Sequence, residues 1–190
     1  RRIVVTPVGE IAAWLHPGDG EAVLHIHAPG ERPLQPDQIQ ADPRCHIAIE
    51  LPGHGASSEI DAIPNALTMQ SALSAVIQAL AGMLPLSIEA HEGAVAYVPA
   101  LAKALGERLR SLVLHRPWLL SADECACFLR QLPAPDIQRG GGHLGDAWQW
   151  ERERHLMWPW LPPSSRSRRL VAARDPQWLH GNTVELLRLG

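Results

Sequence analysis

The first fifty residues alternate between short apolar runs and turns rich in proline and glycine. Apolar runs of this length, bounded by such turns, are typical of β-strands. They predict strands at 3–7, 10–16, 21–27 and 44–50, with the first two forming a hairpin around Gly9. Because the runs are dense in apolar residues, we expect an interior sheet that is covered on both faces.

A helical period replaces this pattern between residues 64 and 84. Apolar residues recur there at helical spacing, as in Leu73, Ile77 and Leu80, and no glycine interrupts them before Gly82. This spacing predicts a helix.

Two more strands and another helix follow. The runs at 84–90 and 110–116 predict strands, and residues 93–109 between them predict a segment that is mostly helical. Pro99 falls in the first or second turn of that helix, where proline is best tolerated. Strands that alternate with helices form parallel sheets with right-handed crossovers. The pattern therefore predicts an α/β fold with a doubly wound, mostly parallel sheet.

The pattern of apolar residues and of turn-forming residues changes after residue 116. Helical patterns at 121–132 and 147–161 enclose a loop rich in proline and glycine, and strand texture returns after a polar linker. Such a segment predicts an insertion between two strands of the sheet. We expect a core at 1–116, a small helical lid at 117–163 and a return to the core at 164–190.

Composition narrows the class of protein. The 190 residues are 46% hydrophobic, which is enough for one sizeable core. A net charge of -3 excludes the basic footprint of a nucleic-acid-binding protein. No apolar run reaches the roughly 18 residues needed to span a bilayer, and the N-terminus lacks the pattern of a signal peptide. Three cysteines argue against a disulfide framework, so we expect a cytoplasmic protein.

The segment A-H-E-G-A at 90–94 places Glu92 at the tip of a tight turn between a strand and a helix. Three interpretations of this carboxylate stay open. It is a nucleophile, an anion stabilised by the N-terminus of the following helix, or a general base whose pKa is raised by burial.

Four segments, in order along the chain, resemble the motifs of the α/β-hydrolase superfamily. They are HIHAPG at 25–30, IELPGHGASS at 49–58, EAHEGAVAY at 89–97 and RSLVLHRP at 110–117. The resemblance covers essentially the whole chain and implies a nucleophilic serine on a strained turn with small neighbours. Ala90, Gly93 and Ala94 keep the small neighbours, but Glu92 replaces the serine. Acyl-serine chemistry is therefore not available at this position.

The resemblance also implies the partners of the nucleophile. The oxyanion hole would use backbone N–H groups of Ala28 and Gly93, and the catalytic acid would be Asp175 in LVAARDP. The family's histidine belongs after the last strand, and His180 lies too close to Asp175 for that role. This histidine is either missing or lies in residues outside this sequence.

The remaining candidates line an expected pocket above Glu92. His27 and His91 lie next to the family's loops, although His27, like His54, more often braces a loop than takes part in chemistry. Trp148 and Trp158 would give the pocket an aromatic wall, or seat the lid on the core.

Two function classes remain. The first is a protein of the hydrolase family that is degenerate in its Ser-His-acid triad and binds a small apolar molecule. The second is an active hydrolase that uses Glu92, Asp175 and an unseen histidine on an ester, halide or epoxide-like substrate. A third class, a protein-interaction module, is favoured by one feature alone, the cluster of tryptophans. We expect no cofactor and no metal, because no metal-ligand motif occurs. We also expect no nucleic acid and no membrane partner, and a homodimer stays open.

Overall fold

The computed structural model describes residues 1–28, 32–39, 42–59 and 65–118, together with the isolated positions 121, 123, 124 and 142. The lid expected at 117–163 and the return to the core at 164–190 fall almost entirely outside these residues, so both stay predictions.

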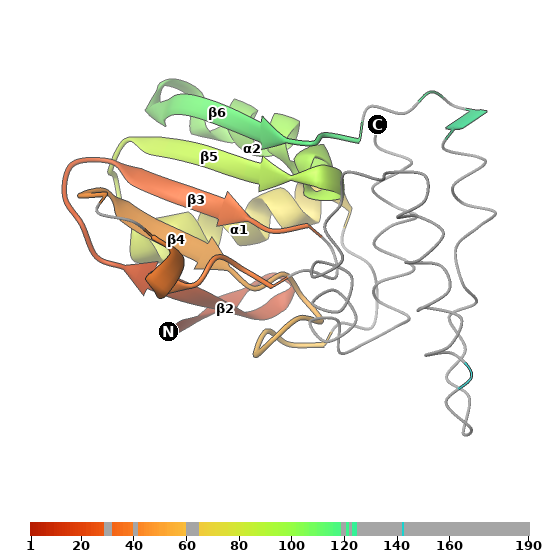
Figure 1. Ribbon diagram of the computed structural model, residues 1–190, viewed down its shortest axis with the longest axis horizontal. Helices are drawn as coiled ribbons and strands as arrows, with labels where there is room; N and C mark the ends of the chain where they lie inside the picture. Colours follow the sequence, from red (N-terminus) through yellow and green to blue (C-terminus); the bar gives the residue numbers. More distant parts are fainter. Residues whose placement is uncertain are drawn as a thin grey trace.

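Six strands form one mixed sheet in the order β1-β2-β4-β3-β5-β6 (Figure 1). The hairpin of β1 and β2 is antiparallel, β2 is also antiparallel to β4, and β4, β3, β5 and β6 run parallel. The predicted mostly parallel α/β sheet is confirmed, and the strand limits differ from the predicted ones by one or two residues. The strands are β1 (Arg2–Thr6), β2 (Gly9–His16), β3 (Ala22–Ile26), β4 (Cys45–Ile49), β5 (Leu86–His91) and β6 (Leu109–His115).

Two α-helices pack against each other on one face of this sheet, behind the strands in Figure 1. The predicted first helix is α1 (Ala66–Leu80), and its start is fixed by Asn65, whose side-chain oxygen accepts the N–H of Thr68 at 2.9 Å. Neither helix, nor any other in the described part of the chain, is long and apolar enough to cross a membrane.

The second predicted helical segment, at 93–109, is confirmed as mostly helical, but it is divided into three consecutive pieces. It consists of the 3-10 helix η2 (Glu92–Tyr97), α2 (Val98–Leu105) and the 3-10 helix η3 (Gly106–Arg108). Pro99 has no N–H to donate to a preceding carbonyl, so α-helical bonding begins next to it rather than running through it. Gly106, with φ 53, ends α2.

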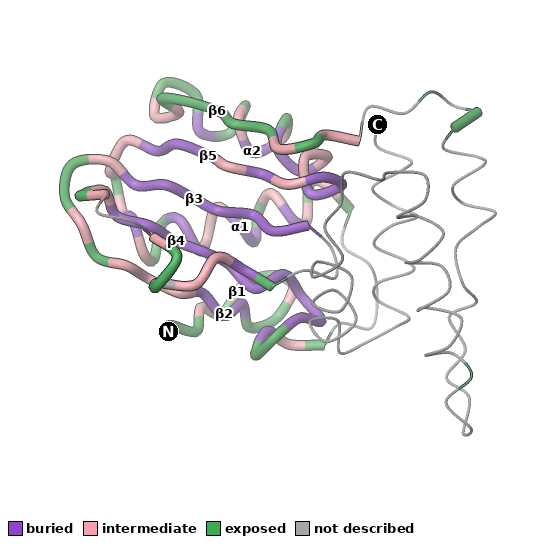
Figure 2. Tube along the Cα trace, viewed as in Figure 1, coloured by how far each residue is buried: buried purple, intermediate pink, exposed green. Residues whose placement is uncertain are grey.

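Side chains of the central strands alternate between two different environments. Leu24, Ile47 and Ile88 are fully buried and belong to the apolar core that the strands form with α1 and α2. The residues that follow Leu24 and Ile88 are His25 and Glu89, which therefore point to the opposite face. Figure 2 shows that β3 is buried along its length. The sheet thus has an apolar face under the helices and a polar face on its other side.

The loop after β4, in the segment similar to a hydrolase motif, is held by polar groups. Glu50 accepts the N–H of Ala56 at 2.5 Å and the indole N–H of Trp14 at 3.0 Å. The buried hydroxyl of Ser57 donates to the carbonyl of Glu50 at 2.5 Å and accepts the N–H of Ala12 at 2.9 Å. These contacts fix the loop against β2 at the carboxyl end of β4.

Replacing Ser57 with alanine tests this anchor. We expect Ser57→Ala to lower the free energy of unfolding by about 1–3 kcal/mol, because a buried N–H and a buried carbonyl each lose a partner. Urea unfolding measures the change. The neighbouring Ser58 accepts the N–H of Glu10 at an exposed site, so Ser58→Ala is the matched control, with an expected loss of about 0.5 kcal/mol or less. Equal effects of the two substitutions would contradict the proposed anchor.

Candidate functional site

The strand-to-helix turn predicted at 90–94 is present, with Glu92 at its tip. Strand β5 ends at His91, and η2 begins at Glu92, whose φ of 50 lies in the left-handed region. A residue with a side chain is strained there by roughly 1–2 kcal/mol. The small neighbours Ala90, Gly93 and Ala94 are all buried.

The carboxylate of Glu92 is buried beside an arginine. Glu92 is 2% exposed, and its Oε1 lies 3.5 Å from Nη2 of Arg116. Arg116 follows β6 directly and also has a φ of 50. Sequence reasoning missed Arg116. The available signal was its position, since β5 and β6 are neighbouring parallel strands and residues at their carboxyl ends meet at one edge of the sheet.

His27 joins the loops that follow β3 and β4. Its Nδ1 lies 2.7 Å from the carbonyl oxygen of Ala28, and its Nε2 accepts the N–H of Leu51 at 2.9 Å. An accepting Nε2 assigns the ring proton to Nδ1, which donates to Ala28. Both imidazole nitrogens are therefore used for bracing. Ala28 and Gly93 are buried close to the turn, and their role as oxyanion-hole donors stays a prediction.

A cavity of about 460 Å³ lies between the polar face of the sheet and the segment 32–38. His27 and His91, two of the expected pocket residues, both line it. Trp148, Trp158 and Asp175 lie outside the described residues, and their roles stay predictions. The lining residues are His25, His27, Arg32, Pro33, Leu34, Gln35, Asp37, Gln38, Glu89, His91 and His115.

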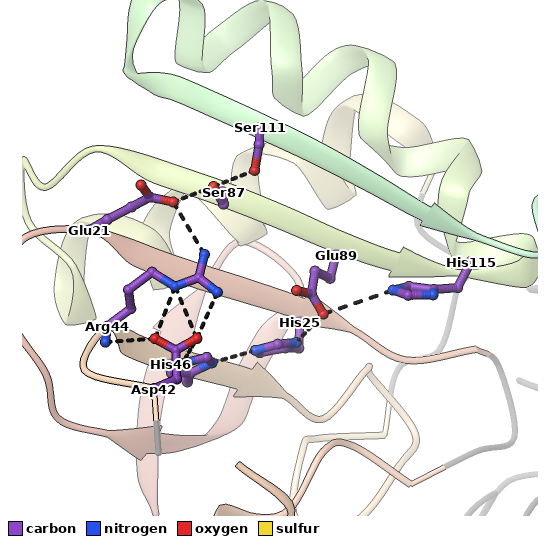
Figure 3. A network of polar contacts seen from close by, with 9 residues as sticks. All are labelled: Glu21, His25, Asp42, Arg44, His46, Ser87, Glu89, Ser111 and His115. Carbon is purple, nitrogen blue, oxygen red and sulfur yellow. Dashed lines mark hydrogen bonds and ion pairs between the residues drawn. The ribbon is translucent and has the colours of Figure 1, made fainter. Parts of the chain in front are cut away.

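Three imidazoles and one carboxylate form the sheet side of this cavity. His25 and Glu89 are direct neighbours on β3 and β5, with Nδ1 of His25 3.2 Å from Oε2 of Glu89. Nε2 of His115 lies 3.9 Å from the same oxygen. The rings of His91 and His115 stack with their centroids 4.3 Å apart. Figure 3 shows His25 and His115 approaching Glu89 from the strands on either side.

Sequence reasoning did not identify Glu89 or His115 as members of a site. The signal was present in the alternation of β5, where Ser87, Glu89 and His91 occupy one face of the strand. No group of three His, Cys, Asp or Glu side chains among the described residues is arranged to hold a metal ion.

Burial keeps several of these histidines neutral. Desolvation lowers the pKa of His27 to about 4, although its contact with the carbonyl of Ala28 opposes the shift. Desolvation, followed by the neighbouring His115, lowers the pKa of His91 to about 4. Burial also lowers the pKa of His25, against the opposing effect of Glu89. His25, His27 and His91 therefore present neutral imidazoles at neutral pH.

These shifts predict a fold that loses stability in acid. A folded-state pKa below the unfolded value of 6.5 means that the unfolded chain binds more protons, so stability is greatest above pH 6.5 and falls as the pH drops toward 4. For the fully buried His27 the expected loss in the free energy of unfolding is roughly 2–3 kcal/mol between pH 7.5 and pH 4.5.

Urea unfolding of the protein and of His27→Gln at the two pH values measures this contribution. We expect the variant to be less stable at pH 7.5 but to lose about 2 kcal/mol less on acidification. Ser57→Ala is a matched control, since it is destabilised without losing a titratable group and keeps the full pH dependence. An unchanged pH dependence in His27→Gln would show that His27 does not titrate as described.

The chain is similar in structure to several solved enzymes, at low sequence identity. An esterase from Thermogutta terrifontis, in its malate-bound form, aligns over 98% of this chain and 72% of its own, with a TM-score of 0.68 and 16% identity. An esterase from Exiguobacterium antarcticum aligns over 97% and 72%, with a TM-score of 0.71 and 14% identity. A haloalkane dehalogenase from Agrobacterium tumefaciens C58 aligns over 99% and 72%, with a TM-score of 0.61 and 18% identity. The sequence matches no protein-family model and no curated protein.

Proposed function

Since the chain has the α/β-hydrolase fold that its sequence predicted, we propose that it is a small-molecule-binding protein whose nucleophile turn carries a structural anion in place of a nucleophile. The observation that carries this proposal is the pairing of the buried Glu92 carboxylate with the guanidinium of Arg116. In this proposal the Ser-His-acid triad is degenerate at its first member.

The physical demands on a nucleophile and on a structural anion differ. A nucleophilic oxygen must reach the substrate carbon with its electron pair available, and errors of about 1 Å reduce rates by roughly 100-fold. An arginine next to Glu92 competes for the same electron pairs and holds the buried carboxylate in place, while the guanidinium itself is partly exposed to solvent. The contact with Arg116 therefore supports a fixed anion.

The cavity next to the turn supports binding. Its volume of about 460 Å³ falls within the range of small-molecule pockets. Its described lining is mostly imidazole, amide and charged groups, so it suits the polar part of a ligand. An apolar part of the ligand, which the sequence predicted, depends on Trp148 and Trp158.

One observation favours the alternative of an active hydrolase. The positive φ of Glu92 is a local strain, and strained residues concentrate at active sites. In that alternative a carboxylate oxygen of Glu92 attacks the carbon of a halide or epoxide, the leaving group departs with its bonding electrons, and water then hydrolyses the ester. Asp175 and an unseen histidine would activate this water. The similarity to a haloalkane dehalogenase supports this second candidate.

Covalent labelling separates the two candidates. Incubation with a panel of alkyl halides and epoxides should leave the peptide containing Glu92 unmodified, because its carboxylate is held by Arg116. Peptide mass spectrometry measures the modification, with Glu92→Gln treated in parallel. An adduct on this peptide that is absent from Glu92→Gln would replace the binding proposal with the hydrolase.

Removing the arginine tests the ion pair itself. Arg116→Met should lower the free energy of unfolding by about 1–3 kcal/mol, because a buried carboxylate loses its cation while the guanidinium was partly solvated. Adding Glu92→Gln to Arg116→Met should restore at least about 1 kcal/mol of this loss. Arg110→Met, at an exposed position of β6, should change stability by about 0.5 kcal/mol or less. Strictly additive effects of the two site substitutions would contradict a direct pair.

A further inference from the structure

A chain of four polar side chains crosses the polar face of the sheet from β4 to β5 (Figure 3). Oδ2 of Asp42 lies 3.3 Å from Nε2 of His46, whose Nδ1 lies 2.9 Å from Nε2 of His25. The Nδ1 of His25 in turn lies 3.2 Å from Oε2 of Glu89. Both imidazoles are buried. The chain ends at Glu89, in the cavity described above.

The number of protons on the two imidazoles determines which of the three contacts are hydrogen bonds and which atom donates in each. Three contacts need three hydrogens, but two neutral imidazoles supply two. A third proton would create a buried imidazolium, and burial opposes this because it lowers the pKa of His25. Near neutral pH one contact therefore lacks its hydrogen.

The contact without a hydrogen is the one at Asp42. Nε2 of His46 has no hydrogen-bond partner of suitable geometry among the described residues. Asp42 is already compensated by Arg44, whose Nη2 and Nε donate to it at 2.7 and 3.0 Å. Both imidazole protons then sit on the nitrogens that face along the chain, so that His46 donates to His25 and His25 donates to Glu89.

Glu89 has no arginine partner, unlike the buried carboxylates of Glu50 and Glu92. Glu50 pairs with Arg1, and Glu92 pairs with Arg116. Glu89 has no arginine or lysine at ion-pair distance in the part of the chain that the structure describes, and both of its ion-pair contacts, to His25 and His115, use Oε2. Its half-buried carboxylate is oriented by His25 but keeps its negative charge, and it lies in the wall of the cavity.

Other charged groups lie around Glu89. Arg32 and Asp37 line the cavity from the segment 32–38 and carry one positive and one negative charge, and Arg32 makes no ion-pair contact with Glu89. The titratable or charged groups that face Glu89 from the described elements are His25 on β3, Asp42, Arg44 and His46 at β4, His91 on β5, His115 on β6, and Arg32 and Asp37 in the segment 32–39.

We propose that this cavity binds a small organic cation through its ammonium group, with Glu89 as the counter-ion. The proposal rests on the proposed function in taking the cavity as a small-molecule site. An ammonium N–H supplies the positive charge that no arginine provides, and charge-assisted hydrogen bonds to carboxylates are among the stronger ones. The stacked rings of His91 and His115 offer a flat surface to the carbon skeleton of the ligand.

The same chain makes this binding dependent on pH. On acidification the chain gains its third proton at Nε2 of His46, and the hydrogen-bonded pair of His46 and His25 that ends at Glu89 then carries a positive charge in place of the ligand's. Affinity for a cation therefore falls as the pH drops below the ordinary range of histidine and stays high near pH 7.5.

Calorimetric titration of the full chain with three matched probes tests the proposal. Benzylammonium is the cation, benzyl alcohol the neutral analogue and phenylacetate the anion. We expect benzylammonium to bind at least tenfold more tightly than either analogue at pH 7.5, and at least threefold more weakly at pH 5 than at pH 7.5. Equal or tighter binding of phenylacetate, or no binding of benzylammonium, would overturn the proposal.

Variants locate the cation. Glu89→Gln should weaken benzylammonium binding at least tenfold, whereas Glu107→Gln, which removes an exposed carboxylate on η3, should leave it unchanged. Unchanged binding in Glu89→Gln would also overturn the proposal, and the three-probe comparison decides it if this variant does not fold. An adduct on Glu92 would remove the proposed function without affecting cation binding. Absence of both adduct and cation binding would remove this inference alone.

Discussion

The alternation of side chains along β3, β4 and β5 determines which residues form the apolar core and which line the polar face of the sheet. Every second residue of these strands is apolar and packs under α1 and α2, and this packing fixes the register of the sheet. The intervening residues include His25, His46 and Glu89, whose side chains must therefore face the other side. Burial of the apolar side chains therefore also brings the polar side chains of these strands together, so the row of polar contacts needs no separate driving force to form.

Strain and charge meet at the carboxyl edge of the same sheet. Glu92 and Arg116 both have left-handed backbones, and each ends one of two neighbouring parallel strands. Each conformation is unfavourable alone, but together they bring a carboxylate and a guanidinium to 3.5 Å. The strained backbone at the carboxyl end of β5 is thus paired with a charge supplied from the end of β6.

The strands, the first helix and the turn at Glu92 could be predicted from the sequence, because each depends on the local spacing of apolar residues and on small or turn-forming residues. The ion-pair partner of Glu92 could not be predicted in this way, since Arg116 is distant in sequence and only the pairing of β5 with β6 brings it near. The contact between His25 and His46 is of the same kind. The division of the helical segment at 93–109 into three pieces follows from Pro99, which cannot donate a backbone hydrogen bond, so α-helical bonding begins beside it. Trp148, Trp158 and Asp175 lie outside the described residues and stay predictions.

The bridging ring of His27 has a consequence for the motions of the site. One imidazole accepts from the N–H of Leu51 and donates to the carbonyl of Ala28, so neither loop can open while the ring stays in place. Opening of the two loops then becomes one cooperative event with a single barrier, and the amide of Leu51 exchanges with solvent on the timescale at which that ring leaves. Two loops that are separate in the chain would thus open together.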